Sequence, residues 1–372
     1  MAVSGVMNRK SLDAPENTIS EDKNKRNRMR FIRNGAFLSV FFFTVFFGGL
    51  YLGRQRIIPF VYTRSEYMIG IYTGSSPLDL KPASGFNPVV TARMVTDVEA
   101  KFVADPFMIE ENGTWYMFFE ILEGTQNKGV IGLATSADGM SWEYDRVVLE
   151  QPFHLSYPHV FRHEGEILMI PESHMNYSVD VYKAESFPYH WVKQKTLLEG
   201  NYLDPTVFQY GGHWYMFAAD RNDMLHLFWA DELLGEWYYH PSSPIIRGDL
   251  VQARPAGRVV VSGDTVIRFA QNCEPHYGWD VRAFFVADLS PETYSEEPFS
   301  GNPVLKGTGA LHEWNGVRMH HLSATRTEEG WIAVVDGVGR WREFGLGLFG
   351  QESNTALGPT IPIKSPYLKR SK

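Results

Sequence analysis

The sequence contains very little cysteine. Cys273 is the single cysteine among 372 residues, so no disulfide can form within the chain. This excludes the small disulfide-held domains that are common among secreted proteins, although it does not exclude a secretory compartment. Stability must come from a buried core, and a chain of this length can bury enough apolar surface without cross-links.

Positive charge is scarce outside the N-terminus. The net charge of the chain is −8, and residues 1–33 hold eight Lys/Arg and four Asp/Glu, which gives +4. The remaining residues therefore carry −12. An acidic body argues against nucleic acid as a partner. The chain also lacks the strand–helix alternation and the Asp-x-Asp metal motif of a nucleotide-sugar transferase.

Long hydrophobic runs are absent with one exception. Residues 35–53 contain 19 residues without a charge, about the length that crosses a bilayer. Six Lys/Arg precede this run between Lys23 and Arg33, and Arg54, Arg56 and Arg64 follow it. The bias of basic residues toward the cytosolic side predicts a signal anchor and a single-pass type II membrane protein. A cleaved signal peptide is the alternative.

A strand–turn–strand pattern recurs through the rest of the chain. Four copies begin at prolines 106, 158, 205 and 255, which are 52, 47 and 50 residues apart, and a looser fifth copy begins near Val317. Repeats of this period, rich in Val, Ile and aromatic residues, are typical of propellers. We predict an all-β fold, a five-bladed β-propeller preceded by one transmembrane helix. A β-sandwich is the alternative.

The domain boundaries follow from these patterns. We predict a disordered cytosolic tail over 1–33, an anchor over 34–53, a stalk over 54–85, the propeller over 86–340 and a flexible tail over 341–372. Residues 87–95 are the candidate for the strand that closes the ring. Asn112 and Asn176 match the N-glycosylation pattern, and a luminal propeller would expose the turn that contains Asn112.

Polar residues cluster at one end of the predicted propeller. The start of each first strand lies beside the end of the antiparallel second strand. The starts hold Asp105, Tyr157, His159, Asp204, Arg254, Arg318, His320 and His321. The ends hold Glu120, Glu172, Asp220, Gln271 and Asp336. We predict that these residues form a polar, substrate-binding pocket. A structural role is the alternative for each of them.

The carboxylates in this set suit acid/base chemistry at a glycosidic bond. One would have a raised pKa and act as the acid while another stays ionised. In this hypothesis Asp105 is the base, Glu172 the acid and Asp204 the orienting carboxylate. No cofactor is predicted. No metal site is predicted either, because the adjacent residues His320 and His321 point to opposite sides of a strand.

Several multi-residue motifs resemble those of a known family. They are residues 154–158, 169–173, 253–255, 271–274 with 277–278, 314–321 and 335–337. Together they are similar to the N-terminal propeller of plant glucosamine inositolphosphorylceramide transferases. The resemblance implies a Golgi type II membrane protein in glycosphingolipid glycosylation. Those enzymes carry a separate C-terminal glycosyltransferase domain, whereas this chain stops after the propeller.

A more distant resemblance links the Asp-Pro starts to family 43 glycoside hydrolases, the arabinanase, levansucrase and invertase group. It implies that Asp105 is the base and Asp204 the orienting residue. Arg254 stands near the place where that family has its acidic Glu, which weakens the expectation of hydrolysis.

The sequence thus leaves three functions open, and whether the chain is an enzyme stays open with them. The first is a luminal, glycan-binding or accessory propeller that binds a carbohydrate or glycolipid, with a separate glycosyltransferase as a possible partner. The second is a glycoside-active enzyme. The third is a non-catalytic interaction scaffold.

Overall fold

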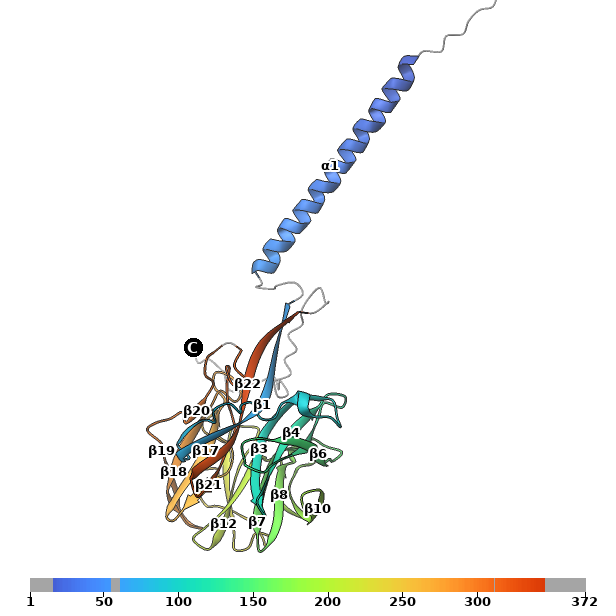
Figure 1. Cartoon of the computed structure of the whole chain (residues 1–372). Coiled ribbons are helices and arrows are strands. Elements are labelled where there is room, and N and C mark those ends of the chain that lie inside the picture. The colour runs from blue at the N-terminus through green and yellow to red at the C-terminus, as the bar shows by residue number, and fades with distance from the viewer. Residues whose placement is uncertain (1–15, 55–60, 311, 345–372) are drawn as a thin grey trace, which may run out of the picture. The chain divides into compact units, whose positions relative to one another are not determined.

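A computed structural model describes residues 16–54, 61–310 and 312–344 (Figure 1). The chain divides into two compact units, an N-terminal helical unit and a β-propeller.

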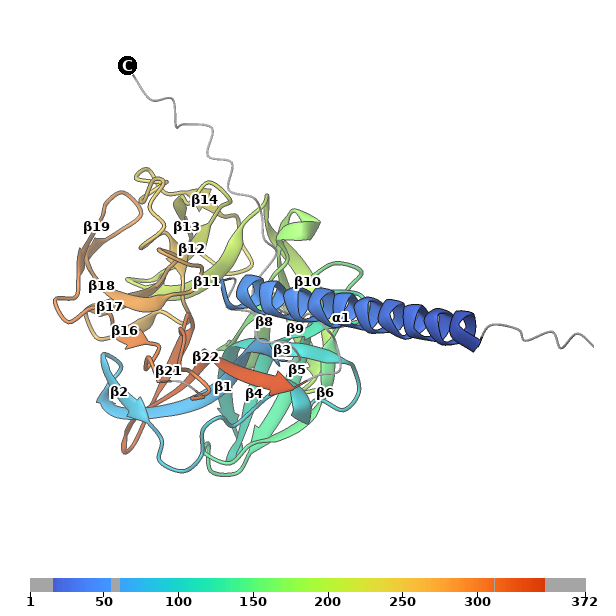
Figure 2. The same cartoon turned by 90° about the horizontal axis from the view of Figure 1, so that it is seen from above.

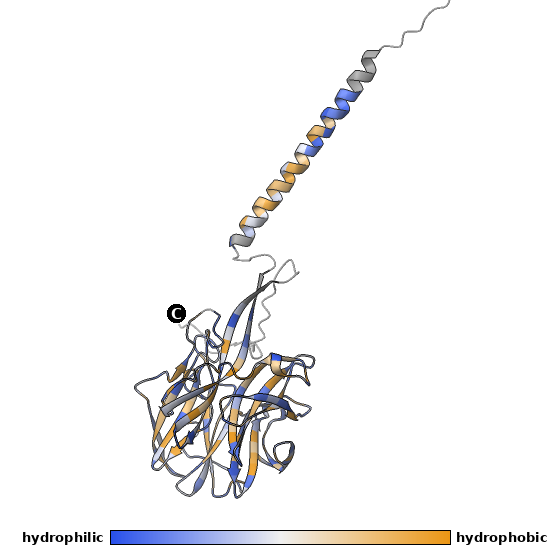
Figure 3. Ribbon diagram, viewed as in Figure 1, coloured by the Kyte–Doolittle hydropathy of each residue, from blue (hydrophilic) through white to orange (hydrophobic). Residues whose placement is uncertain are grey.

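The N-terminal unit contains helix α1 (Glu16–Arg54). Within its stretch Lys23–Tyr51, a window of 18 residues has a mean hydropathy of 1.5, and the helix is long and apolar enough to cross a membrane, a property that signal sequences share. Figure 3 shows a hydrophilic segment followed by a hydrophobic one. The prediction of disorder through residue 33 is wrong from Glu16 onward. No proline or glycine occurs between Glu16 and Asn34, so nothing in that stretch interrupts the helix.

Three antiparallel four-stranded sheets form the first three blades. Blade one comprises β3 (Ala100–Glu111), β4 (Thr114–Glu123), β5 (Lys128–Ser136) and β6 (Glu143–Leu149). Blade two comprises β7 (Ser156–His163), β8 (Glu166–Glu172), β9 (Ser178–Ser186) and β10 (His190–Glu199). Blade three comprises β11 (Leu203–Tyr210), β12 (His213–Ala219), β13 (Leu225–Ala230) and β14 (Tyr238–Tyr239). Two 3-10 turns, η1 (Ala92–Met94) and η2 (His174–Asn176), lie between strands.

Blade four has an interrupted inner strand. Its first strand is split into β15 (Arg254–Pro255) and β16 (Val260–Ser262), and both pieces pair with β17 (Thr265–Asn272). The sheet continues through β18 (Asp280–Leu289), which pairs with β19 (Tyr294–Pro298) and β20 (Leu305–Lys306). Gly257 lies in the break with φ +125°, and a Cβ there would come within 2.0 Å of the Leu322 carbonyl oxygen. Only glycine fits this close approach.

Blade five closes the ring with strands from both ends of the chain (Figure 2). Its order is β21 (Leu322–Thr327), β22 (Gly330–Phe344), β1 (Val61–Ser76) and β2 (Asp79–Pro82). Residues 61–82 therefore belong to the propeller, and the predicted stalk over 54–85 is wrong for them. Residues 87–95 do not supply the closing strand, because only Val90 among them bridges to β1, at Ile69. Burial in β1 is continuous from Glu66 to Tyr72, so the strand lacks the alternation that would mark it in the sequence.

The starts of the first three inner strands share a strained backbone. Asp105, Tyr157 and Asp204, each followed by proline, have φ values of 52°, 47° and 51°. The strand pairing shifts register at the same three places. These are bulges, which re-aim side chains next to functional sites. The prolines of the first three repeats thus mark a bulge with a positive φ as well as the start of a strand.

Apolar side chains fill the seams between neighbouring blades. Between blades one and two, for example, Phe118 and Met169 belong to one buried cluster. Between blades two and three, Ile170 and Met216 do the same. The described residues contain such a cluster in each of the five seams. Burial of these faces holds the sheets together and fixes the positions of the strand ends.

Candidate functional site

The strand register brings the predicted polar residues to one end of the propeller. Ala104, next to Asp105, pairs with Glu120. Ser156 pairs with Glu172, and Arg254 pairs with Gln271. The starts of the inner strands and the ends of the second strands therefore share an end, which we call the polar end.

Three carboxylates at the ends of second strands fasten one blade to the next. Asp336 Oδ2 accepts a hydrogen bond from the Asp105 backbone N–H at 3.0 Å. Glu172 Oε2 accepts one from the Asp204 N–H at 2.9 Å. Glu120 Oε1 lies 3.3 Å from His154 Nε2 at the entry to blade two. These three carboxylates therefore join neighbouring blades. This is the structural role that the sequence left open as the alternative to ligand binding.

The seam between blades five and one contains a histidine held by a carboxylate. Asp336 Oδ1 accepts a hydrogen bond from His320 Nδ1 at 2.7 Å. The backbone N–H groups of His320 and His321 also donate to this oxygen. The His320 ring stacks on Tyr67 of β1, with centroids 4.6 Å apart. Arg318 lies over the same tyrosine ring. Both carboxylate oxygens of Asp336 therefore accept hydrogen bonds. Its interactions with His320 hold the pKa of Asp336 below the usual range despite burial.

Asp105 has a different environment. It is 6% exposed, and its Oδ1 atom has no hydrogen-bond partner among the described residues. His320 Nε2 and His321 Nδ1 approach this oxygen only to 3.7 and 3.8 Å. Burial, together with the charges of Glu120, Asp204 and Asp336, raises the pKa of Asp105 well above its ordinary value. A raised pKa disfavours the ionised form that a base requires.

We expect Asp105→Asn to reduce the pH dependence of stability. A carboxyl group whose pKa rises on folding stabilises the folded state fully below its unfolded pKa, about 4. That contribution is lost as the pH rises toward the folded pKa, by at most about 1.4 kcal/mol per pH unit. Asparagine tolerates the positive φ of this position and cannot ionise. Urea unfolding at pH 5 and pH 8 should show a smaller loss for the variant, and equal losses would contradict the assignment.

Glu172 and Asp204 share a second buried cluster with Arg254. Glu172 Oε1 lies 2.6 Å from His174 Nδ1, and Glu172 Oε2 lies 3.6 Å from Arg254 Nη2. Burial opposes ionisation, but His174 and Arg254 lower the pKa of Glu172 below its ordinary value. A glutamate held ionised has no proton to donate, which argues against the acid role considered from the sequence.

Asp204 completes this cluster. Its Oδ2 atom accepts hydrogen bonds from Arg254 Nε at 2.5 Å and Gln271 Nε2 at 3.0 Å. Burial, opposed by Arg254 and assisted by Glu172, raises the pKa of Asp204 to about 8. Gln271 also donates to the Pro255 carbonyl oxygen at 2.9 Å. The cluster therefore ties blades two, three and four together at the polar end.

Three of the predicted substrate-binding residues form a plug on the propeller axis. Tyr157, His159 and His321 are 0%, 1% and 0% exposed. Their rings contact Phe107, with centroid distances of 4.8, 5.1 and 4.8 Å. Burial lowers the pKa of His321 to about 3, so this imidazole is neutral. The structure places all three in packing positions below the polar end.

The possible metal ligands at the polar end are Asp105, His320 and Asp336, whose donor atoms lie within 4.8 Å of one another. Both Asp336 oxygens already accept hydrogen bonds, and His320 Nδ1 is engaged with Asp336. Among the described residues this group offers three ligand residues, one fewer than a structural zinc site uses, and its Asp336 and His320 side chains already bond to each other.

Asp220 lies beside a cavity of about 350 Å³ on blade three. Its Oδ1 atom accepts hydrogen bonds from the backbone N–H groups of Asn222 and Met224, and its Oδ2 atom lies 3.2 Å from His226 Nε2. The cavity, which we call the blade-three pocket, is lined by Asn201, Tyr202, Asp220, Arg221, Asn222, His226 and Tyr239. Arg221 connects it to the buried cluster, because its Nη2 atom lies 3.0 Å from His174 Nε2.

Several residues of the polar end were missed in the sequence. Tyr67 lay in the predicted stalk, whereas His154 and His174 sit next to repeated motifs without repeating themselves. Tyr277, in the loop after β17, lies 5.1 Å from the Arg254 guanidinium and 5.4 Å from the His320 ring. Its neighbour Gly278 has φ +64° and touches His320. The family motif at 277–278 was the one available signal.

The two predicted glycosylation sites are accessible. Asn112 lies exposed in the turn between β3 and β4, with φ 52°. Asn176 is exposed in η2, and its Nδ2 atom donates to Ser178 Oγ at 2.9 Å. Their modification stays a prediction.

The five sheets define a five-bladed β-propeller, a fold that solved structures of other proteins share. A putative glycosidase from Bacteroides thetaiotaomicron superposes with a TM-score of 0.52 and 11% identity, over 70% of this chain and 97% of that one. A putative glycoside hydrolase from Bacteroides ovatus gives 0.50 and 11%, over 70% and 98%. At these identities the likeness shows the fold alone.

Sequence comparison is more specific. The family described as "Glucosamine inositolphosphorylceramide transferase 1, N-terminal" matches residues 63–338, and the chain belongs to this family. Glucosamine inositolphosphorylceramide transferase 1 of Oryza sativa subsp. japonica is 35% identical over 297 residues, 73% of this chain and 40% of the relative. The Arabidopsis thaliana protein of that name is 34% identical over 299 residues, 73% and 39%. The chain thus spans about two fifths of the length of these relatives.

Proposed function

We propose that this chain is a membrane-anchored propeller that binds a glycan or glycolipid in glycosphingolipid glycosylation. Family membership supports the sugar and sphingolipid chemistry, because the relatives are named as glucosamine inositolphosphorylceramide transferases. The apolar part of α1 would be the anchor. In this proposal the propeller is luminal, in the Golgi or elsewhere in the secretory pathway, and a separate glycosyltransferase acts beside it.

The observation that carries the proposal is the blade-three pocket. Its volume, about 350 Å³, is at the small end of the range for ligand sites. It combines the exposed ring of Tyr239 with the polar side chains of Arg221 and Asn222. An aromatic face suits the C–H face of a sugar, and the polar groups suit its hydroxyls. Arg221 would also suit a phosphate.

Binding fits the polar end better than hydrolysis does. His174 and Arg254 lower the pKa of Glu172, whereas burial raises the pKa of Asp105 and so favours its protonated form. An acid Glu172 and a base Asp105 would need the opposite protonation states. In the glycan-binding proposal, these carboxyl groups position the blades around the ligand site.

We expect Tyr239→Ala to weaken ligand binding about tenfold, since the loss of an aromatic contact worth about 1.4 kcal/mol has an effect of this size. The adjacent Tyr238→Ala is the matched control. Both tyrosines lie on β14 and are exposed, at 43% for Tyr238 and 59% for Tyr239, but Tyr238 does not line the pocket. The control should bind within about twofold of wild type.

The assay is titration with vesicles that carry inositolphosphorylceramide, with and without an added glucosamine, against vesicles that lack the headgroup. Equal losses of binding affinity in the two tyrosine variants would show that the blade-three pocket is not the ligand site. Absence of any headgroup-dependent binding would favour the interaction-scaffold alternative.

A further inference from the structure

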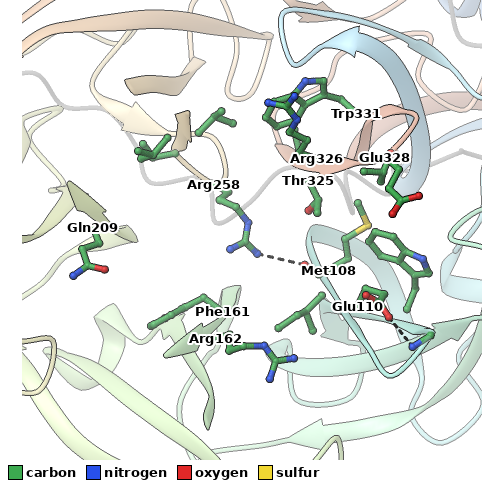
Figure 4. A pocket seen from close by; sticks show the side chains of 18 residues that line it. Met108, Glu110, Phe161, Arg162, Gln209, Arg258, Thr325, Arg326, Glu328 and Trp331 are labelled. Carbon is green, nitrogen blue, oxygen red and sulfur yellow. Dashed lines mark hydrogen bonds between the residues drawn. The ribbon is translucent and has the colours of Figure 1, made fainter. Parts of the chain in front are cut away.

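A larger cavity lies at the ends of the inner strands opposite the polar end. Figure 4 shows the side chains that line it. Its volume is about 810 Å³. The inner strands of all five blades contribute to its wall, through Met108, Phe161, Gln209, Val260 and Thr325. We call it the axial pocket. None of the polar-end residues predicted from the sequence lines it.

Arg258 projects into the axial pocket from the break in the inner strand of blade four (Figure 4). Gly257 lets the chain pass close to β21 at this break, and its N–H donates to Tyr157 Oη at 2.7 Å. The interruption between β15 and β16 thus directs the Arg258 guanidinium toward the axis. A continuous strand would place this side chain by the regular alternation of the sheet instead.

The guanidinium of Arg258 has no carboxylate partner among the described residues. Its Nη2 atom donates to the Val160 carbonyl oxygen at 2.7 Å and to that of Met108 at 3.4 Å. Its Nε atom is buried and has no hydrogen-bond partner.

Arg254 and Arg268 differ in this respect. Arg254 pairs with Asp204 at 2.5 Å, and Arg268 pairs with Glu296 at 2.6 Å. Desolvation lowers the pKa of Arg258 to about 10, so it remains a cation at neutral pH. Arg258 is half-buried, and a cation that is partly removed from water without an anion is costly to the folded protein.

The acidic side chains around the axial pocket either bond to other groups or lie exposed at its rim. Glu110 Oε1 accepts a hydrogen bond from the Gly113 N–H at 2.6 Å, and Glu111 pairs with Arg162. Glu328 is exposed at the rim, as is Arg326. The interior therefore presents positive charge at Arg258 without a neutralising side chain.

The walls near Arg258 are apolar. Met108, Phe161 and Val260 are 1%, 8% and 5% exposed, and Ala324 is also buried. The Phe107 ring lies 5.9 Å below the guanidinium and closes the pocket toward the aromatic plug. A ligand that fills this space must combine an apolar body with an anionic group that can reach the floor.

We infer that the axial pocket binds an amphiphilic anion, whose phosphate or carboxylate pairs with Arg258 while its apolar part lies against Met108, Phe161 and Val260. Such a group could belong to a lipid or to a soluble metabolite, and both share this chemistry. The inference does not depend on the glycan-binding proposal, because the blade-three pocket shares no residue with the axial pocket.

The test uses the full chain in lipid nanodiscs and calorimetric titration with octyl phosphate, with heats from empty nanodiscs subtracted. Inorganic phosphate and octanol are the two partial probes, and a phospholipid with a phosphomonoester headgroup, placed in the disc, tests the lipid source by competition. Wild type should bind octyl phosphate at least tenfold more tightly than either partial probe. Arg258→Met should weaken that binding at least tenfold.

Arg258→Met also separates ligand binding from a structural role. Replacing a half-buried cation that has no carboxylate partner with an apolar side chain of similar length should leave the melting temperature unchanged or higher. Arg146→Met, at an exposed position on β6, is the control and should bind as wild type does.

Three results would overturn the inference. They are the absence of octyl phosphate binding to wild type, equal binding by Arg258→Met, and inorganic phosphate binding as tightly as octyl phosphate. Competition by the lipid in the disc would identify a membrane source, and its absence together with octyl phosphate binding would identify a soluble one.

Discussion

A fragment of residues 86–343 is expected not to fold, whereas a fragment of residues 63–343 folds as a propeller. The shorter fragment lacks β1 and β2, the outer half of blade five. Strand β1 buries Tyr67, Met68, Ile69, Ile71 and Tyr72, each at most 5% exposed. At roughly 1.5–3 kcal/mol for each buried side chain, their loss amounts to about 8–15 kcal/mol. That equals the whole stability of a typical domain, about 5–15 kcal/mol.

The loss of β1 would also expose an edge of β22, which invites aggregation. Circular dichroism melting and size-exclusion chromatography of the two fragments would measure the difference. A cooperative transition of the shorter fragment, at the same temperature as the longer one, would show that blade five does not need its N-terminal strands.

Asp336→Ala should cost about 3–5 kcal/mol of stability. The substitution removes the acceptor for His320 Nδ1 and for the backbone N–H groups of residues 105, 320 and 321. All of these groups lie in a seam from which water is excluded, since Asp336 is 0% exposed. Breaking a buried network by removing one partner carries a penalty of this size.

Asp79→Ala is the control for this prediction. Asp79 is on β2 of the same blade and forms an ion pair with Lys81, but both side chains are largely exposed. Exposed pairs contribute about 1 kcal/mol or less. Urea unfolding of the 63–343 fragment should therefore separate the two variants clearly. A loss below about 1 kcal/mol for Asp336→Ala would mean that this seam is not held by the carboxylate.

The sequence predicted the blades because the repeat has a constant period and because its prolines mark the same structural place. The turn between paired strands also repeats, so the polar residues could be assigned to one end. Blade five was only half predicted. Its strand β1 pairs with β22, far away in the sequence, and β1 has no copy of the Asp-Pro start that would have marked it.

The candidate site was harder to predict than the fold. The pattern placed Glu172 and Asp336 at the polar end, but not their bonds to the backbone of the next blade. Those bonds depend on the bulges at Asp105 and Asp204, which turn the N–H groups toward the neighbouring strand end. Tyr157 and His321 looked equivalent to site residues, yet the aromatic packing around Phe107 draws them into the axis. Protonation states follow from these contacts and could not be read from spacing.

Two sites at opposite ends of the axis have different origins in the sequence. The polar end uses the repeated positions of every blade. The axial pocket depends on the one blade whose inner strand is interrupted, where Gly257 and Arg258 replace the regular pattern. A departure from a repeat can therefore indicate a site as well as the repeat itself does.

The central claim is that the propeller binds a sugar-bearing ligand without cleaving it. The most direct measurement incubates the 63–343 fragment with glucosamine-bearing inositolphosphorylceramide in vesicles, and follows bound protein and released sugar in the same sample. The account predicts saturable, headgroup-dependent binding and no released sugar over many hours. Sugar released by wild type, and lost in Glu172→Gln, would contradict it and make this propeller a glycoside-active enzyme.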